Sequence, residues 1–303
     1  MLYRKIIIKP SDGYFQDYSP VNPKKGSLST HVILFIATLI TTTVVGAIMA
    51  GANPVTSPLG IARGLPFSLT LLTILGIHEF GHYFAARSWK IDVTLPYFIP
   101  APFIPIGTFG AVIKMKSTIP NRKALIDVGA TGPVAGFVVS IIACVVGLHM
   151  SSFGQFKPDE LSGNLLLGES LIFRLLGYLV HGSVPDSEIL TLHPVAFAGW
   201  LGLFVTALNL IPIGQLDGGH ILFALSPRIH EFIRRLRLPI LLLMGVTFWS
   251  GWYLWAVILF FIGGPHPYPD YMDSRIGVFR RILAISTLAI FVLCIIPAPV
   301  KTG

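Results

Sequence analysis

Apolar runs recur along this sequence, and the first of them, residues 29–50, is long enough to cross a lipid bilayer as a helix. Hydrophobic residues make up 53% of the chain and charged residues only 12%, whereas a soluble domain averages about 25% charged residues. A chain of this composition places apolar surface against lipid instead of enclosing it in one large core. The sequence therefore predicts an integral, multi-pass membrane protein, with the lipid bilayer among its partners.

The distribution of the apolar runs predicts an all-α polytopic membrane protein with six to seven transmembrane helical segments. The number depends on residues 238–263, which are either one span or a hairpin of two helices that turns near Ser250 and Gly251. We favour the hairpin, because a single crossing would put the arginines that follow on the wrong side of the membrane. The expected segments are 29–50, 66–87, 125–149, 193–212, 230–249, 252–263 and 280–297, with an amphipathic helix over 165–180 at the outer interface.

Basic residues predict the orientation of the chain. The net charge is +8, Lys24 and Lys25 precede the first predicted span, and Arg87 ends the second. Because cytoplasmic loops carry an excess of Lys and Arg, we expect a cytoplasmic N-terminus in the cell membrane of a prokaryote. No basic stripe is interleaved with aromatics, so no nucleic-acid partner is expected. The sequence does not indicate an oligomeric state. The expected domains are a cytoplasmic segment, 1–28, and one transmembrane domain, 29–303, with its core at 66–226.

The connection between the second and third predicted spans is unusual. Residues 95–116 are apolar but contain four prolines and two glycines, so a straight helix is not expected. Irregular backbone at membrane depth must be covered by protein or line a wet cavity. We therefore expect a re-entrant loop or β-hairpin that enters from the cytoplasmic side, with residues 107–110 near its tip. The alternative is a loop that lies on the membrane surface.

The second predicted span contains an HExxH pattern at residues 78–82. Residues four apart lie on one face of a helix, so His78 and His82 can bind one Zn²⁺. Glu79 lies about 100° round the helix from His78, which suits a base acting on metal-bound water better than a third ligand. Ionisable residues within a span are costly, which favours a functional site over a chance match. At 1.5 Å rise per residue, the site is expected about 14 Å below the cytoplasmic surface at Arg87.

Asp217 is the best candidate for a third ligand, since a catalytic Zn²⁺ commonly has three protein ligands and an open position for water. It directly follows the fourth predicted span, and Pro212 and Gly214 break that helix and let the chain turn. The two glycines after Asp217 leave room for a close approach. The alternative is that Asp217 caps the helix that begins near His220.

Other polar and small residues give weaker signals. Asn209, before the turn, is a candidate to bind a substrate carbonyl, although an asparagine within a span equally pairs two helices. His220 is a candidate to contact a residue of the metal site or a developing oxyanion. The small residues at 129–136 favour close helix packing, with a direct catalytic role as the alternative.

Two motifs in separate spans, HExxH at 78–82 and Leu-Asp-Gly at 216–218, together resemble the site-2 protease family of intramembrane zinc metalloproteases. The order of the motifs, the small-residue run between them and the Asn209-x-x-Pro212 lead-in add to the resemblance. It covers about residues 66–226, just over half of the chain.

The resemblance implies hydrolysis of peptide bonds within or near transmembrane segments of membrane-protein substrates, as in regulated intramembrane proteolysis. It further implies that His78, His82 and Asp217 bind one Zn²⁺ per chain and that Glu79 is the catalytic base. The alternative function is a membrane metal-binding transporter or channel. Carboxylate and histidine residues are scarce elsewhere in the predicted spans, so the sequence contains no visible relay for such transport.

A helical substrate hides its carbonyl groups and must unwind locally before it is cleaved. An edge strand within residues 109–116 is expected to hold the extended segment by strand addition. This hypothesis makes Phe109, Val112 and Ile113 candidate substrate-binding residues.

Overall fold

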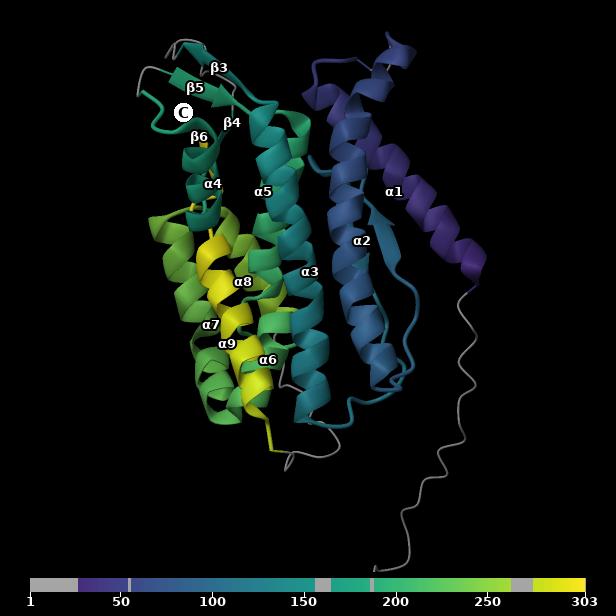
Figure 1. The fold of residues 1–303 in the computed structure, drawn as a ribbon, viewed down its shortest axis with the longest axis vertical. Coiled ribbons are helices and arrows are strands. Elements are labelled where there is room, and N and C mark those ends of the chain that lie inside the picture. The colour runs from purple at the N-terminus through teal and green to yellow at the C-terminus, as the bar shows by residue number, and fades with distance from the viewer. Residues whose placement is uncertain (1–26, 54–55, 156–164, 186–187, 263–274, 303) are drawn as a thin grey trace, which may run out of the picture.

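The structure, a computed structural model, describes residues 27–53, 56–155, 165–185, 188–262 and 275–302 (Figure 1). The described residues are mostly helical. Among these residues, three helical stretches are long and apolar enough to cross a membrane: α1 (Leu28–Met49), α2 (Leu65–Ser88) with the 3-10 helix η1 (Pro58–Gly64) before it, and α3 (Arg122–His149). All but the last two residues of the predicted segment 1–28 lie outside the described residues.

The first three helices lie within three residues of their predicted bounds. A proline in the first turn of α2 marks its start, as the sequence indicates. Helix α3 begins at Arg122, three residues before the predicted start, because the Asn121 side chain accepts a hydrogen bond from the backbone N–H of Ala124 at 3.0 Å.

A β-hairpin connects α2 to α3 and contains no helix, as the prolines predict. Its strands β1 (Tyr97–Pro100) and β2 (Thr108–Val112) pair antiparallel. The turn is formed by residues 101–107, closed by Ala101 N–H donating to the Gly107 oxygen at 3.0 Å. The expected tip at 107–110 is therefore placed too late, because Thr108 already begins the second strand. The turn packs on α1, where the Thr41 hydroxyl donates to the Gly107 oxygen at 2.7 Å.

The described residues from 194 to 294 are mainly helical and follow the predicted order. Its helices are α5 (Pro194–Asn209), α6 (Asp217–Leu225), α7 (Pro227–Thr247), α8 (Gly251–Ile262) and α9 (Val278–Cys294). Of the predicted segment 238–263, the described residues 238–262 form parts of two helices joined by a turn, in agreement with the favoured hairpin. Helices α7 and α8 pack against each other.

Two further small sheets show that the predicted all-α class is incomplete. Strand β3 (Ser152–Gln155) pairs with β5 (Glu188–Thr191), and β4 (Leu165–Leu167) pairs with β6 (Val300–Thr302), both antiparallel. The amphipathic helix expected over 165–180 begins later, as α4 (Leu171–His181), because the Ser170 side chain caps it and residues 165–167 are in β4.

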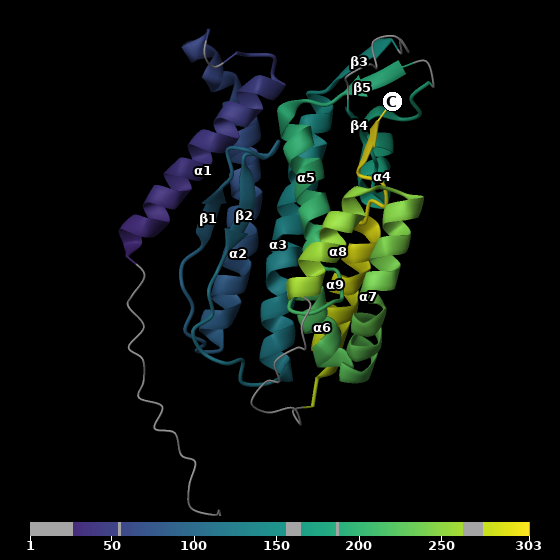
Figure 2. The same cartoon turned by 180° about the vertical axis from the view of Figure 1, so that it is seen from behind.

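Helix α3 lies in the centre of the molecule. It packs against α2 on one side and α5 on the other, and also contacts α6 and α9. Helix α1 and the β1–β2 hairpin lie beyond α2, whereas α7, α8 and α9 form the opposite flank (Figures 1 and 2). The predicted site residues lie on α2, on and directly after β2 of the hairpin, at the end of α5 and in the first turn of α6, around this central helix.

Candidate metal centre and active site

Helix α2 directs two imidazoles and a carboxylate into the bundle. His78, Glu79 and His82 are 5%, 9% and 6% exposed, whereas Phe80 and Phe84 on the same helix are 39% and 65% exposed. One helical turn separates the two histidines, and their Nε2 atoms lie 3.1 Å apart. The polar residues of the motif are therefore buried, and large apolar side chains occupy the outer face of the helix.

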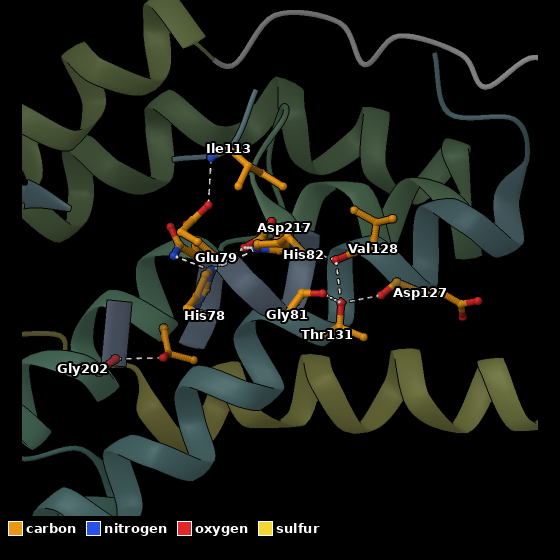
Figure 3. A network of polar contacts seen from close by, with 12 residues as sticks. His78, Glu79, Gly81, His82, Ile113, Asp127, Val128, Thr131, Gly202 and Asp217 are labelled. Carbon is orange, nitrogen blue, oxygen red and sulfur yellow. Dashed lines mark hydrogen bonds and ion pairs between the residues drawn. The ribbon is translucent and has the colours of Figure 1, made fainter. Parts of the chain in front are cut away.

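Asp217 reaches the same place from the first turn of α6. The chain turns between α5 and α6 at Gly214, which has a φ of 59° that favours glycine. The Asp217 Oδ2 atom lies 3.4 Å from His78 Nε2 and 3.3 Å from His82 Nε2 (Figure 3). Leu216 occupies the N-cap position of α6 and no side chain caps it, so the capping alternative does not describe this aspartate.

The three donor atoms form a nearly equilateral triangle with sides of 3.1, 3.3 and 3.4 Å. In a tetrahedral site with metal–ligand bonds of about 2.0–2.1 Å, two ligand atoms lie about 3.3 Å apart. The triangle therefore has the dimensions of one face of such a site. The donor set, two imidazole nitrogens and a carboxylate oxygen, is also one that zinc binds.

A backbone carbonyl on α3 fixes the tautomer of His82. The Nδ1 atom of His82 lies 2.7 Å from the Val128 oxygen (Figure 3). A carbonyl only accepts hydrogen bonds, so Nδ1 carries the proton, and in the neutral imidazole Nε2 then presents a lone pair to the cluster. An ionised carboxylate has only lone pairs as well. The lone pairs of His82 and Asp217 therefore face one another, an arrangement that a cation stabilises.

Glu79 is held by the hairpin and not by the two imidazoles or the Asp217 carboxylate. Its Oε2 atom accepts a hydrogen bond from the backbone N–H of Ile113, the residue after β2, at 3.0 Å. Glu79 still lies in the cluster, since one ligand atom from each of His78, Glu79 and His82 falls within 4.8 Å of the others. Asp217 nevertheless fits a third-ligand position better, because its oxygen is close to both Nε2 atoms.

The cluster opens into a cavity of about 260 Å³ between the hairpin and the α5–α6 connection. Four residues predicted to serve substrate binding or the metal site line this cavity, namely Asn209, Val112, Ile113 and His220. The Asn209 amide nitrogen lies 3.4 Å from His78 Nε2. A polar side chain thus lies beside the ligand triangle, at the wall of a space large enough for part of a peptide.

Phe109 is the one predicted substrate residue that does not line the cavity. Its side chain is 69% exposed. Gly110 has a φ of 100°, and the β1–β2 register is irregular between Phe98 and Pro100. This irregularity breaks the alternation of side chains along β2, so Phe109 does not share the environment of Ile113.

Three features of the site are beyond what the sequence analysis identified. Gly132 and Gly136 lie four residues apart on α3, and a Cβ at Gly132 would collide with the His82 imidazole. A Cβ at Gly136 would lie 3.0 Å from His78 Nδ1. The small-residue run signals close packing, but not that the packed surface consists of these two imidazoles. Gln215 also lines the cavity, with no signal in the sequence beyond its nearness to Asp217.

Comparison with known families agrees with this geometry. A model of "Peptidase family M50" matches residues 66–249, more than half of the chain. The chain belongs to peptidase family M50, the site-2 protease family. The matched residues of this M50 protein include both motifs, the hairpin and the helices that surround the cavity. Family membership and the three helical stretches of spanning length together identify an integral membrane protein.

The M50 protein is similar to several curated plant proteins. It is 33% identical over 246 residues to "Probable zinc metalloprotease EGY1, chloroplastic" of Oryza sativa subsp. japonica. This alignment covers 78% of this chain and 41% of the relative. EGY1 of Arabidopsis thaliana is 36% identical over 166 residues, 52% of this chain and 29% of the relative. EGY2 of Arabidopsis thaliana is 31% identical over 204 residues, 66% of this chain and 35% of the relative. The chain thus spans less than half the length of these relatives.

Proposed function

We propose that this M50 protein is an intramembrane zinc metalloprotease that hydrolyses peptide bonds within or near transmembrane segments of other proteins. The observation that carries the proposal is the ligand triangle, whose sides of 3.1 to 3.4 Å join two imidazoles and a carboxylate beside a buried glutamate. Family membership and the zinc metalloprotease names of the relatives favour proteolysis over transport.

We assign one Zn²⁺ per chain to His78, His82 and Asp217. When bound, the ion supplies a Lewis acid that acidifies a water molecule and polarises a carbonyl group. The ligand set carries one negative charge, which offsets part of the charge of the cation and reduces the cost of burying it. Glu79 remains outside the ligand set, one helical position from His78, where its carboxylate faces the same cavity.

Glu79 is the proposed general base and acid. Its carboxylate takes a proton from the attacking water and passes that proton to the leaving amine, so that it returns to its ionised state. Its bond to the Ile113 N–H holds one carboxylate oxygen, Oε2, and leaves the other for the reacting water. Asn209, beside His78, is placed to donate a hydrogen bond to the carbonyl of the substrate.

The proposed substrate is a transmembrane segment that unwinds near the site. We propose that its extended backbone adds to the edge of β2 and that Val112 and Ile113 contribute the edge groups. Ile113 supports this, because the bond from its N–H to Glu79 turns this edge of the hairpin toward the active site. His220 lines the same cavity and is proposed to contact the metal site or the oxyanion.

We further propose a single transmembrane domain over 29–303, with its core at 66–226 and six to seven spans. In this arrangement the β1–β2 hairpin re-enters the bilayer from the side of the basic loops, and residues 1–28 are cytoplasmic. The proposed location is the cell membrane of a prokaryote, whereas the relatives compared above are named as chloroplast proteins. Single cysteines at the exposed Ser57 and Ser117 should react with a membrane-impermeant thiol reagent from opposite sides.

The proposal is tested with Glu79→Gln in full-length protein reconstituted in liposomes. The probe is a peptide with one transmembrane segment that contains helix-breaking residues. The variant should keep one zinc per chain and lose cleavage by about 10²-fold or more, because the general base is gone. His78→Ala is the matched control that should lose both. Cleavage by Glu79→Gln at the wild-type rate would refute the proposed mechanism.

A further inference from the structure

Asp127 on α3 accepts hydrogen bonds from two other helices at one end of the bundle. Arg280 of α9 donates from Nε at 2.9 and 3.0 Å and from Nη2 at 2.8 Å. Trp89, the C-cap residue of α2, donates from Nε1 to the same carboxylate at 3.0 Å. The Arg280 guanidinium also lies 5.6 Å from the centroid of the Trp89 ring. One carboxylate thus ties α2, α3 and α9 together.

The residue after Asp127 contacts the candidate metal centre directly. Val128 is buried, and its backbone oxygen accepts the 2.7 Å hydrogen bond from His82 Nδ1. One turn further, the Thr131 hydroxyl lies 3.1 Å from the Gly81 oxygen of α2 and 2.9 Å from the Asp127 oxygen (Figure 3). This part of α3 therefore faces the second half of the HExxH motif.

We propose that Asp127, with Arg280 and Trp89, is a positioning group that holds the Val128 carbonyl against His82 and so sets the geometry of the metal centre. This inference rests on the proposed zinc function. Neither Asp127 nor Arg280 touches the cavity. They act through the α2–α3 register, because a helix is stiff and the Val128 carbonyl is one residue from the anchored side chain.

The geometry makes this positioning sensitive. A shift of about 1 Å between α2 and α3 would stretch the 2.7 Å bond to Val128 beyond the range of a hydrogen bond. His82 would then lose the partner that keeps its proton on Nδ1. The forked contact of Arg280 with a carboxylate fixes direction as well as distance, which a lysine in its place would not.

A second ion pair in the chain provides a matched control. Glu231 on α7 accepts hydrogen bonds from Arg234 at 2.6 and 2.7 Å and from Arg235 at 2.9 Å, and it lines no part of the cavity. Glu231→Gln therefore removes one arginine-bound carboxylate from the protein, as Asp127→Asn does, without touching the α2–α3 interface.

The experiment measures metal binding in full-length protein in detergent, with Zn²⁺ in competition with a chelator and with Co²⁺ as a spectroscopic probe. Asp127→Asn should weaken Zn²⁺ binding by roughly tenfold, the lower end of the effect of removing an outer partner of a ligand. The Co²⁺ absorption spectrum should change as well. Trp89→Phe and Arg280→Lys should show smaller changes in the same direction, and Glu231→Gln should match the wild type.

The outcomes separate this inference from the proposed function. Wild-type Zn²⁺ affinity and Co²⁺ spectrum in folded Asp127→Asn would overturn the positioning role alone. An equal loss in Glu231→Gln would overturn it too, because the effect would then be general. If Asp127→Asn does not fold, the test uses Trp89→Phe and Arg280→Lys instead. Wild-type Zn²⁺ affinity in both of these variants would refute the inference. A wild-type protein that binds neither metal would overturn the proposed function itself.

Discussion

The α2–α3 interface and the α7–α8 hairpin both pack helices around glycines, but the glycines have different neighbours. On α3, Gly132 and Gly136 lie against the imidazoles of His82 and His78. On α7, Gly245 lies against the ring of Tyr253, which is 41% exposed. A ring at the surface can rotate away from a new methyl group, whereas the buried His82 imidazole is held by the Val128 carbonyl and cannot. Glycines at a helix contact therefore set the geometry of the candidate metal centre at the α2–α3 interface, whereas at the α7–α8 hairpin they affect only the local packing.

The largest effect is expected from Gly132→Ala. The added Cβ would overlap the His82 imidazole and displace a proposed zinc ligand, so zinc content and cleavage should both be lost. Metal analysis of the purified variant measures this. The matched control is Gly177→Ala on α4, where no atom of the described residues lies within 4 Å of the added Cβ, and it should keep one zinc per chain. Full zinc content in Gly132→Ala would mean that α2 and α3 are not packed as described.

The second-largest effect is expected on substrate cleavage, with zinc content unchanged. Ile113→Pro removes the N–H that donates to Glu79 and interrupts the edge used for strand addition. Cleavage of a transmembrane peptide should be abolished while zinc content stays at one per chain. Ile113→Ala keeps the backbone donor and should cleave at a rate close to the wild type. Equal activity of the two variants would rule out strand addition at this residue.

The smallest effect is expected on the α7–α8 side. Gly245→Ala places a Cβ 2.5 Å from a carbon of the Tyr253 ring, which must move. Overpacking of this kind costs about 1–3 kcal/mol of stability, with zinc content and cleavage unchanged. Thermal unfolding and metal analysis of the same sample check both parts. Loss of zinc in this variant would contradict the difference between the two regions.

The sequence predicts the helices and the proposed ligands well because their signals are local. The apolar runs mark α1, α2 and α3, and HExxH places two imidazoles on one face without any tertiary information. The position of Asp217 as a candidate third ligand is predictable because Pro212 and Gly214 indicate a turn just before this carboxylate. The turn near Ser250 and Gly251 likewise separates α7 from α8.

The remaining features depend on pairings that no local pattern encodes. Every residue has a backbone carbonyl, so nothing marks that of Val128 as the partner of His82. Arg280 and Asp127 are 153 residues apart in the sequence, and the paired strands β6 and β4 are also far apart along the chain. Phe109 fails to reach the cavity because Gly110 breaks the alternation that its position in a strand implies.

The central claim is that His78, His82 and Asp217 bind one zinc ion, and X-ray absorption at the zinc edge tests it most directly. We expect one zinc per chain with two imidazole ligands and only nitrogen or oxygen neighbours at about 2.0–2.1 Å. Asp217→Ala should lower zinc occupancy and alter the first coordination shell. A protein without stoichiometric zinc, or a zinc environment that Asp217→Ala leaves unchanged, would contradict the account.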